Sequence, residues 1–148
     1  MVTAAMILAE IRRYSDWPRR LEMFIEYRKT IPFRWGKNDC CLFAADAIES
    51  MTGVDLAREF RGTYKTELGA MRHLLKEGSV FGIACRIARN AGIKPCAGAM
   101  AGRGDVVYVK GEQHALGVVG LSGDSIWILT VDGLGQVPLS RAVCGWHI

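Results

Sequence analysis

The sequence predicts an α+β fold in which helices come first and an antiparallel sheet follows. Before Gly92, apolar residues recur at the three- and four-residue spacing of amphipathic helices. Beyond Pro95 they form short β-type runs separated by turns such as SGD and DGLG. Because none of its 148 residues form an obvious linker or internal repeat, the chain is expected to fold as a single globular unit.

Four helices are expected in the first part of the chain. The first covers residues 15–30, with Asp16 placed to cap it and Pro32 to end it. Its charged side chains, including Arg28, are expected to form a solvated face. The other three are expected at 40–51, closed by Gly53, at 66–78, with Thr66 as cap, and at 79–92.

Five β-type runs follow the helices. They are DVVYVK, HALGVVGL, SIWILTV, GQVPL and VCGWHI. The stretch CAGAMAGRG, residues 96–104, precedes them and is expected to be a loop because its residues are so small.

Composition excludes several functional classes. Nineteen basic and 15 acidic residues give a net charge of +4 without a basic stripe, so no nucleic-acid partner is expected. The apolar runs are shorter than the roughly 20 residues of a membrane span, and no secretory signal is expected at the start. Five irregularly spaced cysteines favour a reducing compartment over a disulfide framework. Without CxxC or HxxxH spacing, no metal or other cofactor is expected.

Two adjacent cysteines follow the residue expected to cap the second helix. With Asp39 as N-cap, Cys40 is the first helical residue, near unpaired amides that favour a thiolate. Steps of three and four from Cys40 reach an apolar face, so its side chain should point toward the sheet, with Cys41 beside that contact. Cys40 is therefore the candidate nucleophile; the alternative is a small residue buried in the core.

A cysteine nucleophile needs a base, usually an imidazole within hydrogen-bond reach. The chain contains His73, His114 and His147. His73 falls on a charged helix and His147 next to the last residue, whereas His114 opens a β-run. His114 is therefore the candidate base.

Two motifs resemble the boxes of NlpC/P60 cysteine peptidases. NDCCLFAADA is similar to the DCSGF/L box, whose cysteine is the nucleophile, and RGDVVYVKGEQHALGVVG is similar to the GDLV strand and the HVGIY strand after it. The resemblance implies a papain-like fold with Cys40 as nucleophile and His114 as base.

The match departs from those boxes at three positions. The family histidine lies two residues before the strand glycine, where this chain has Ala115, so His114 is one position out. Such a slip turns a strand side chain to the opposite face unless a bulge corrects it. Cys41 replaces the serine of the box. The third polar residue of the catalytic set has no clear match; the candidates are Ser125, Thr130 and Asp132.

A longer resemblance covers Pro32 to Ile148 and is carried by FRWGKNDCCLFAADAIESMTGVDLAREFRGTY, TELGAM and GQVPLSRAVCGWHI. These stretches resemble small phage-encoded proteins of the DUF6950 type, found among tail genes. Residues 1–31 are then an N-terminal helical segment and 32–148 the NlpC/P60-like domain. The resemblance implies a component of the phage tail tip, made in the host cytoplasm and carried in the virion, with tail-hub or tail-tip proteins as partners.

Two functions stay open. The first is a structural tail component with a degenerate catalytic site, which the position of His114 favours. The alternative is an active cysteine peptidase or amidase that cleaves peptidoglycan stem peptides during DNA entry. A host-encoded domain unrelated to phage is a third interpretation.

Overall fold

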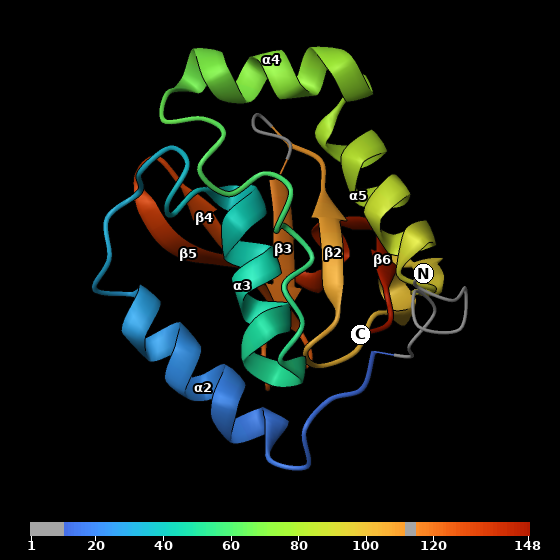
Figure 1. Ribbon diagram of the computed structural model, residues 1–148. Helices are drawn as coiled ribbons and strands as arrows, with labels where there is room; N and C mark the ends of the chain where they lie inside the picture. The colour runs from blue at the N-terminus through green and yellow to red at the C-terminus, as the bar shows by residue number, and fades with distance from the viewer. Residues whose placement is uncertain (1–10, 112–114) are drawn as a thin grey trace.

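A computed structural model describes residues 11–111 and 115–148, and it has the predicted α+β architecture (Figure 1). The helices are α2 (Trp17–Arg28), α3 (Cys40–Thr52), α4 (Glu67–Glu77) and α5 (Val80–Asn90). The strands are β1 (Pro95–Ala97), β2 (Val106–Val109), β3 (Ala115–Val119), β4 (Ser125–Thr130), β5 (Gly133–Pro138) and β6 (Ala142–Trp146). Short 3-10 helices lie at Gly98–Met100 (η1) and Leu139–Arg141 (η2).

The six strands form one sheet in the order β1-β6-β2-β3-β4-β5, and every neighbouring pair is antiparallel, as predicted. The edge strand β1 was not predicted, since residues 96–104 were expected to be a loop. Its three residues pair with β6, where Cys96 lies opposite Gly145. So short a segment has no periodicity of its own, and its strand character comes from a partner about fifty residues away.

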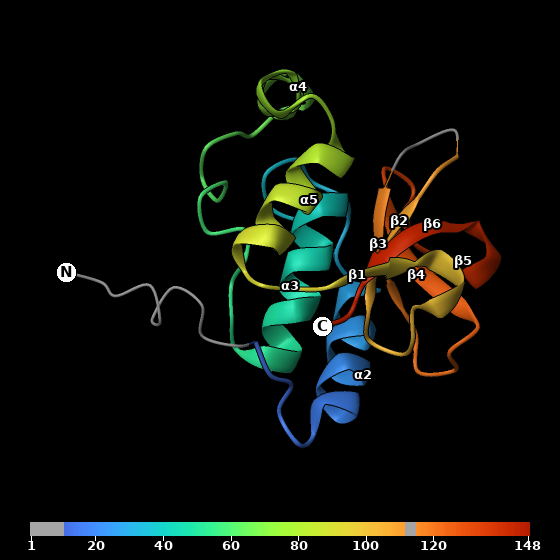
Figure 2. The same cartoon turned by 90° about the vertical axis from the view of Figure 1, so that its right-hand side faces the viewer.

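One face of the sheet carries α2, α3 and α5, whereas α4 extends beyond it (Figure 2). The main core lies between α3 and this face, where Phe43 and Met51 pack against Leu116 and Val118. On the opposite face, a smaller cluster that includes Val107, Val119 and Ile126 packs with Leu139 of η2 and with Ala101, which follows η1. Alternation along β3 therefore separates the two cores.

Helix α2 belongs to the main core, since Leu21 and Ile25 are buried and Phe24 stacks on Phe43 with ring centroids 5.4 Å apart. Two expectations for this helix are wrong. Asp16 occupies the N-cap position without a side-chain cap; its carboxylate accepts instead from Arg20 Nε at 2.7 Å. Arg28 is not on a solvated face.

Arg28 pairs with Asp46 of α3 and donates to Asn38 Oδ1 at 2.7 Å. Only 15% of its side chain is exposed. Asp46 also pairs with Arg61, which links α2, α3 and the connection after α3. Sequence periodicity places Arg28 on a helix face, but the acidic partner that buries it comes from another helix.

Helix α4 has the predicted cap and α5 has one that was not predicted, but both helices have little buried surface. Thr66 accepts from Gly69 N at 3.1 Å, and Ser79 accepts from Gly82 N at 2.9 Å. No residue of α4 is fully buried, and Ala88 is the single buried residue of α5. Within the described ranges, no helix is long and apolar enough to cross a membrane.

Candidate active site

Helix α3 begins as the sequence predicts. Asp39 has an extended backbone, and its side chain accepts from Leu42 N at 3.0 Å, which makes it the N-cap. Cys40 is therefore the first helical residue, and Gly53, at φ +78°, ends the helix. The sulfur of Cys40 lies where helix amides lack backbone partners, as a nucleophile at this end of a helix requires.

Asp39 also joins three segments around the helix start. Its Oδ2 accepts from Gly36 N at 3.0 Å and from the Tyr64 hydroxyl at 2.5 Å. Gly36 has φ +78°, and a Cβ there would lie 2.1 Å from the Tyr64 carbonyl oxygen. The chain therefore makes a close approach at Gly36, and only glycine fits both the angle and the space.

The two cysteine sulfurs lie 3.9 Å apart and are both half-buried. The hydrogen bond with the Cys41 thiol lowers the pKa of Cys40 against the opposing effects of burial and the Asp39 charge. Backbone hydrogen bonds from Leu116 and Cys41 lower the same pKa. The hydrogen bond to Cys40 and burial both raise the pKa of Cys41. Cys40 is therefore the member of the pair that ionises first.

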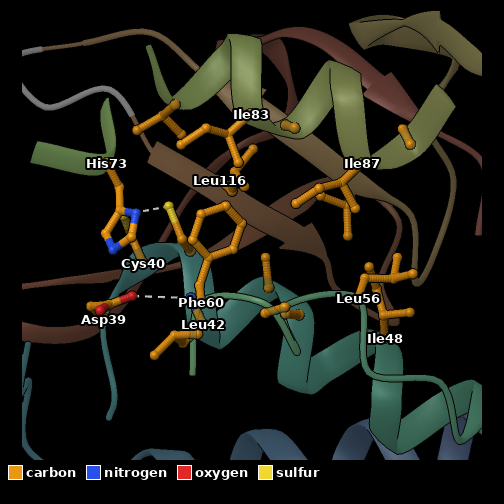
Figure 3. A pocket seen from close by; sticks show the side chains of 18 of the residues that line it. Asp39, Cys40, Leu42, Ile48, Leu56, Phe60, His73, Ile83, Ile87 and Leu116 are labelled. Atoms are coloured by element: carbon orange, nitrogen blue, oxygen red, sulfur yellow. Dashed lines mark hydrogen bonds between the residues drawn. The ribbon is translucent and has the colours of Figure 1, made fainter. Parts of the chain in front are cut away.

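Cys40 lines a cavity of about 230 Å³ (Figure 3). Its walls come from α3, the connection 53–66, α4, α5 and strands β2 and β3. They are mostly apolar, with Leu42, Phe60, Ile83 and Leu116 among the residues that form them. The helix start thus faces an open space beside the sheet, as a substrate site requires.

His73 of α4 lines the same cavity, and Figure 3 places its ring at the end where Cys40 lies. The ring contacts Tyr64 edge-on at 5.6 Å between centroids, and its Nε2 lies 2.9 Å from Thr63 Oγ1. From the sequence, His73 is not the expected base because it falls on a charged helix. Counted from Ala70, His73 is at i+3 and Leu74 at i+4, and all three residues line the cavity. That short stripe on one helix face was the available signal.

His114, the predicted base, lies outside the described residues, so its role stays a prediction. The adjacent Ala115 is buried in β3. Ser125, Thr130 and Asp132, the candidates for the third polar residue, belong to β4 and the turn after it, and none of them lines the cavity.

His147 belongs to a separate cluster. Its Nδ1 lies 2.9 Å from Oδ2 of the buried Asp105, whose Oδ1 accepts from Arg13 at 2.8 Å and from Ile148 N at 3.0 Å. Arg13 also donates to the Ile148 carbonyl, so this carboxylate fastens the segment before α2 to the last residues. The cluster has a structural role.

Cys85, Cys96 and Cys144 are free thiols outside the cavity. Burial raises the pKa of Cys96 and of Cys144, which keeps both protonated and unreactive. In ranges 11–111 and 115–148, no group of three or more His, Cys, Asp or Glu side chains could hold a metal ion.

The fold and the site together define a class of protein. It is a small α+β domain in which a cysteine at the N-terminus of a helix and a histidine lie at one end of an apolar cavity. The chain belongs to the family described as "Domain of unknown function (DUF6950)", whose family model matches residues 12–148. No curated protein and no solved structure matches the chain.

Proposed function

We propose that Cys40 is the nucleophile of a thiol-dependent amide hydrolase of the NlpC/P60 type. One observation carries the proposal: the Cys40 sulfur lies at the start of a helix, is hydrogen-bonded to the Cys41 thiol, and lines a cavity together with His73. A thiol whose pKa is lowered and which borders a cavity is typical of reactive cysteines.

The mechanism follows from these groups. The Cys40 thiolate attacks the substrate carbonyl carbon, and the backbone N–H of Cys40 contributes to holding the oxyanion. Because Nε2 of His73 is engaged by Thr63, Nδ1 is its nitrogen for proton transfer with the thiol. The amide C–N bond then breaks as the imidazolium protonates the leaving amine. Water hydrolyses the thioester, which releases the carboxylate and restores Cys40.

His73 is the reason to place the active enzyme ahead of a degenerate one. The sequence favours the degenerate site because His114 is one position out of register. An imidazole from α4 gives the thiol a second candidate base, so activity does not depend on His114 alone.

The setting of a phage tail tip rests on the resemblance of residues 32–148 to tail-gene proteins. In that setting the substrate would be the stem peptide of peptidoglycan, the partners tail-hub or tail-tip proteins, and the location the virion.

Alkylation tests the nucleophile. Cys40 should react with limiting iodoacetamide at neutral pH before the other four cysteines, with the labelled site read by peptide mass spectrometry. Cys41→Ser retains a donor and restores the serine of the NlpC/P60 box, so reactivity at pH 7 should persist. Cys41→Ala removes the donor and should move the Cys40 alkylation profile to higher pH.

Hydrolysis tests the reaction. Cys40→Ala should abolish release of amines from purified peptidoglycan, whereas Cys85→Ala, a thiol outside the cavity, should not. A wild-type Cys40 no more reactive than Cys85, together with no hydrolysis, would contradict the proposal.

A structural tail component is the second candidate, and one observation favours it. Asp39, the carboxylate nearest the thiol in sequence, already accepts from Gly36 N, Leu42 N and the Tyr64 hydroxyl. It is therefore not available to orient an imidazole. This function predicts unreactive cysteines and a chain that co-purifies with tail-hub subunits whether or not Cys40 is present.

A further inference from the structure

We propose that the Cys40 cavity binds a linear aliphatic acyl chain, with the carbonyl at Cys40 and the chain running along α3 and α5. The inference replaces the stem peptide, which rests on the resemblance to tail-gene proteins, with a substrate class argued from the cavity lining, and it rests on the proposed Cys40 nucleophile for its chemical step. Chain binding itself does not require the thiol.

The cavity has one polar end and one apolar end (Figure 3). Asp39, Cys40 and His73 lie together at one end, whereas Leu56 and Ile87 lie at the other. An acyl compound has the same polarity, with a reactive carbonyl at one end and a hydrocarbon chain behind it. Burying that chain is favourable by the area it removes from water.

The polar lining residues of this cavity are concentrated at the Cys40 end, where Tyr64 also lies against the His73 ring. Asp39 and Tyr64 already bond to each other there. A stem peptide would bring carboxylates and amides into the apolar part, and such groups are unfavourable when buried without partners. A saturated hydrocarbon chain has no polar groups and needs no hydrogen-bond partners there.

The volume also fits a chain. A cavity of roughly 150 Å³ lined by aliphatic residues holds benzene, which has six carbons. On that scale, 230 Å³ accommodates roughly eight or nine carbons. Alanines on the facing helices, among them Ala44 of α3 and Ala84 of α5, line this space with the smallest side chain that has a Cβ.

Acylation by two esters measures the chain preference. The Cys40 thiolate attacks the ester carbonyl of 4-nitrophenyl octanoate, a C–S bond forms, and the C–O bond breaks to release 4-nitrophenolate. Water later converts the thioester to octanoate and free thiol. Relative to a small-molecule thiol, Cys40 should react with the octanoate about tenfold or more faster than with 4-nitrophenyl acetate.

Two substitutions, one within α5 and one at its C-cap, test where the acyl chain lies. Ala84→Leu extends into the cavity and should remove most of the octanoate preference. Ala91→Leu, at the C-terminal end of the same helix and outside the cavity, is the matched control and should keep the preference. Circular dichroism establishes that both variants fold.

A binding measurement separates the inference from the proposed function. Cys40→Ala cannot be acylated there, yet octanoate and not acetate should change its tryptophan fluorescence, since Trp35 and Trp146 line the cavity. If octanoate binds but the wild-type protein is not acylated, the result supports acyl-chain binding in the cavity and contradicts the proposed hydrolase function. Equal ester rates without an octanoate-dependent fluorescence change overturn the inference, even if Cys40 is acylated.

Discussion

Helices α3 and α4 both border the cavity, but α3 is mostly buried in the core whereas α4 lies at the surface. Eight of the 13 residues of α3 are buried, whereas none of the 11 residues of α4 is. Helix α3 with α2 and the sheet forms the stable part of the domain. Helix α4 contributes His73 to the site while Leu68 and Leu75 stay exposed. The candidate nucleophile, Cys40, therefore belongs to the buried helix, whereas the candidate base, His73, belongs to the helix with no buried residue.

The largest expected effect is a loss of stability on replacing a buried residue of α3. Phe43 is fully buried and stacks on Phe24, so Phe43→Ala should lower the free energy of unfolding by about 3–5 kcal/mol. Leu75→Ala on α4, where 82% of the residue is exposed, should change it by less than about 0.5 kcal/mol. Urea titration followed by circular dichroism measures both. Similar losses would mean that α4 is as firmly packed as α3.

The next largest effect is expected at two glycines with positive φ, Gly36 before α3 and Gly62 in the connection between α3 and α4. Gly36→Ala combines a positive φ with a clash against the Tyr64 carbonyl, whereas Gly62→Ala, at φ +76°, meets no atom within 4 Å. Gly62→Ala should lower the unfolding free energy by about 1 kcal/mol from backbone strain alone. Gly36→Ala should lower it by about 1–3 kcal/mol more. Equal losses in urea titration would show that the Tyr64 contact contributes nothing.

The smallest effect is on the pH dependence of the ion pairs. The hydrogen bond from Arg61 lowers the pKa of Asp55, which lies on the connection between α3 and α4. This stabilisation is therefore fully present above the unfolded pKa of about 3.9 and is lost as pH falls through the lower folded value.

The test compares two arginine variants. Arg61→Gln should reduce the difference between urea midpoints at pH 6 and pH 2.5. Arg20→Gln, which removes the exposed partner of Asp16, should change that difference less because the pair is more fully solvated. An equal change in both variants would contradict a special role for the Arg61 pair.

The sequence was sufficient to predict features that depend on neighbouring residues. Asp39, Thr66 and Gly53 mark helix ends through hydrogen bonds or backbone angles that depend on residues within four positions. The order of the elements and the antiparallel sheet follow from the change in periodicity. Cys40 at a helix start could be predicted for the same reason.

The remainder of the site depends on distant contacts. His73 reaches the cavity because the connection before α4 is held through Tyr64, whose partner Asp39 is 25 positions away. Arg28 is buried by Asp46 of another helix, and β1 exists because β6 returns beside it. No pattern within one segment encodes these pairings.

The adjacent sulfurs at the start of α3 have a consequence for titration experiments. Because each thiol changes the proton affinity of the other, the apparent pKa values from spectroscopy or labelling belong to the pair as a whole. A curve measured on the native chain thus reports two macroscopic steps, and single-site replacements show how each thiol titrates without its neighbour.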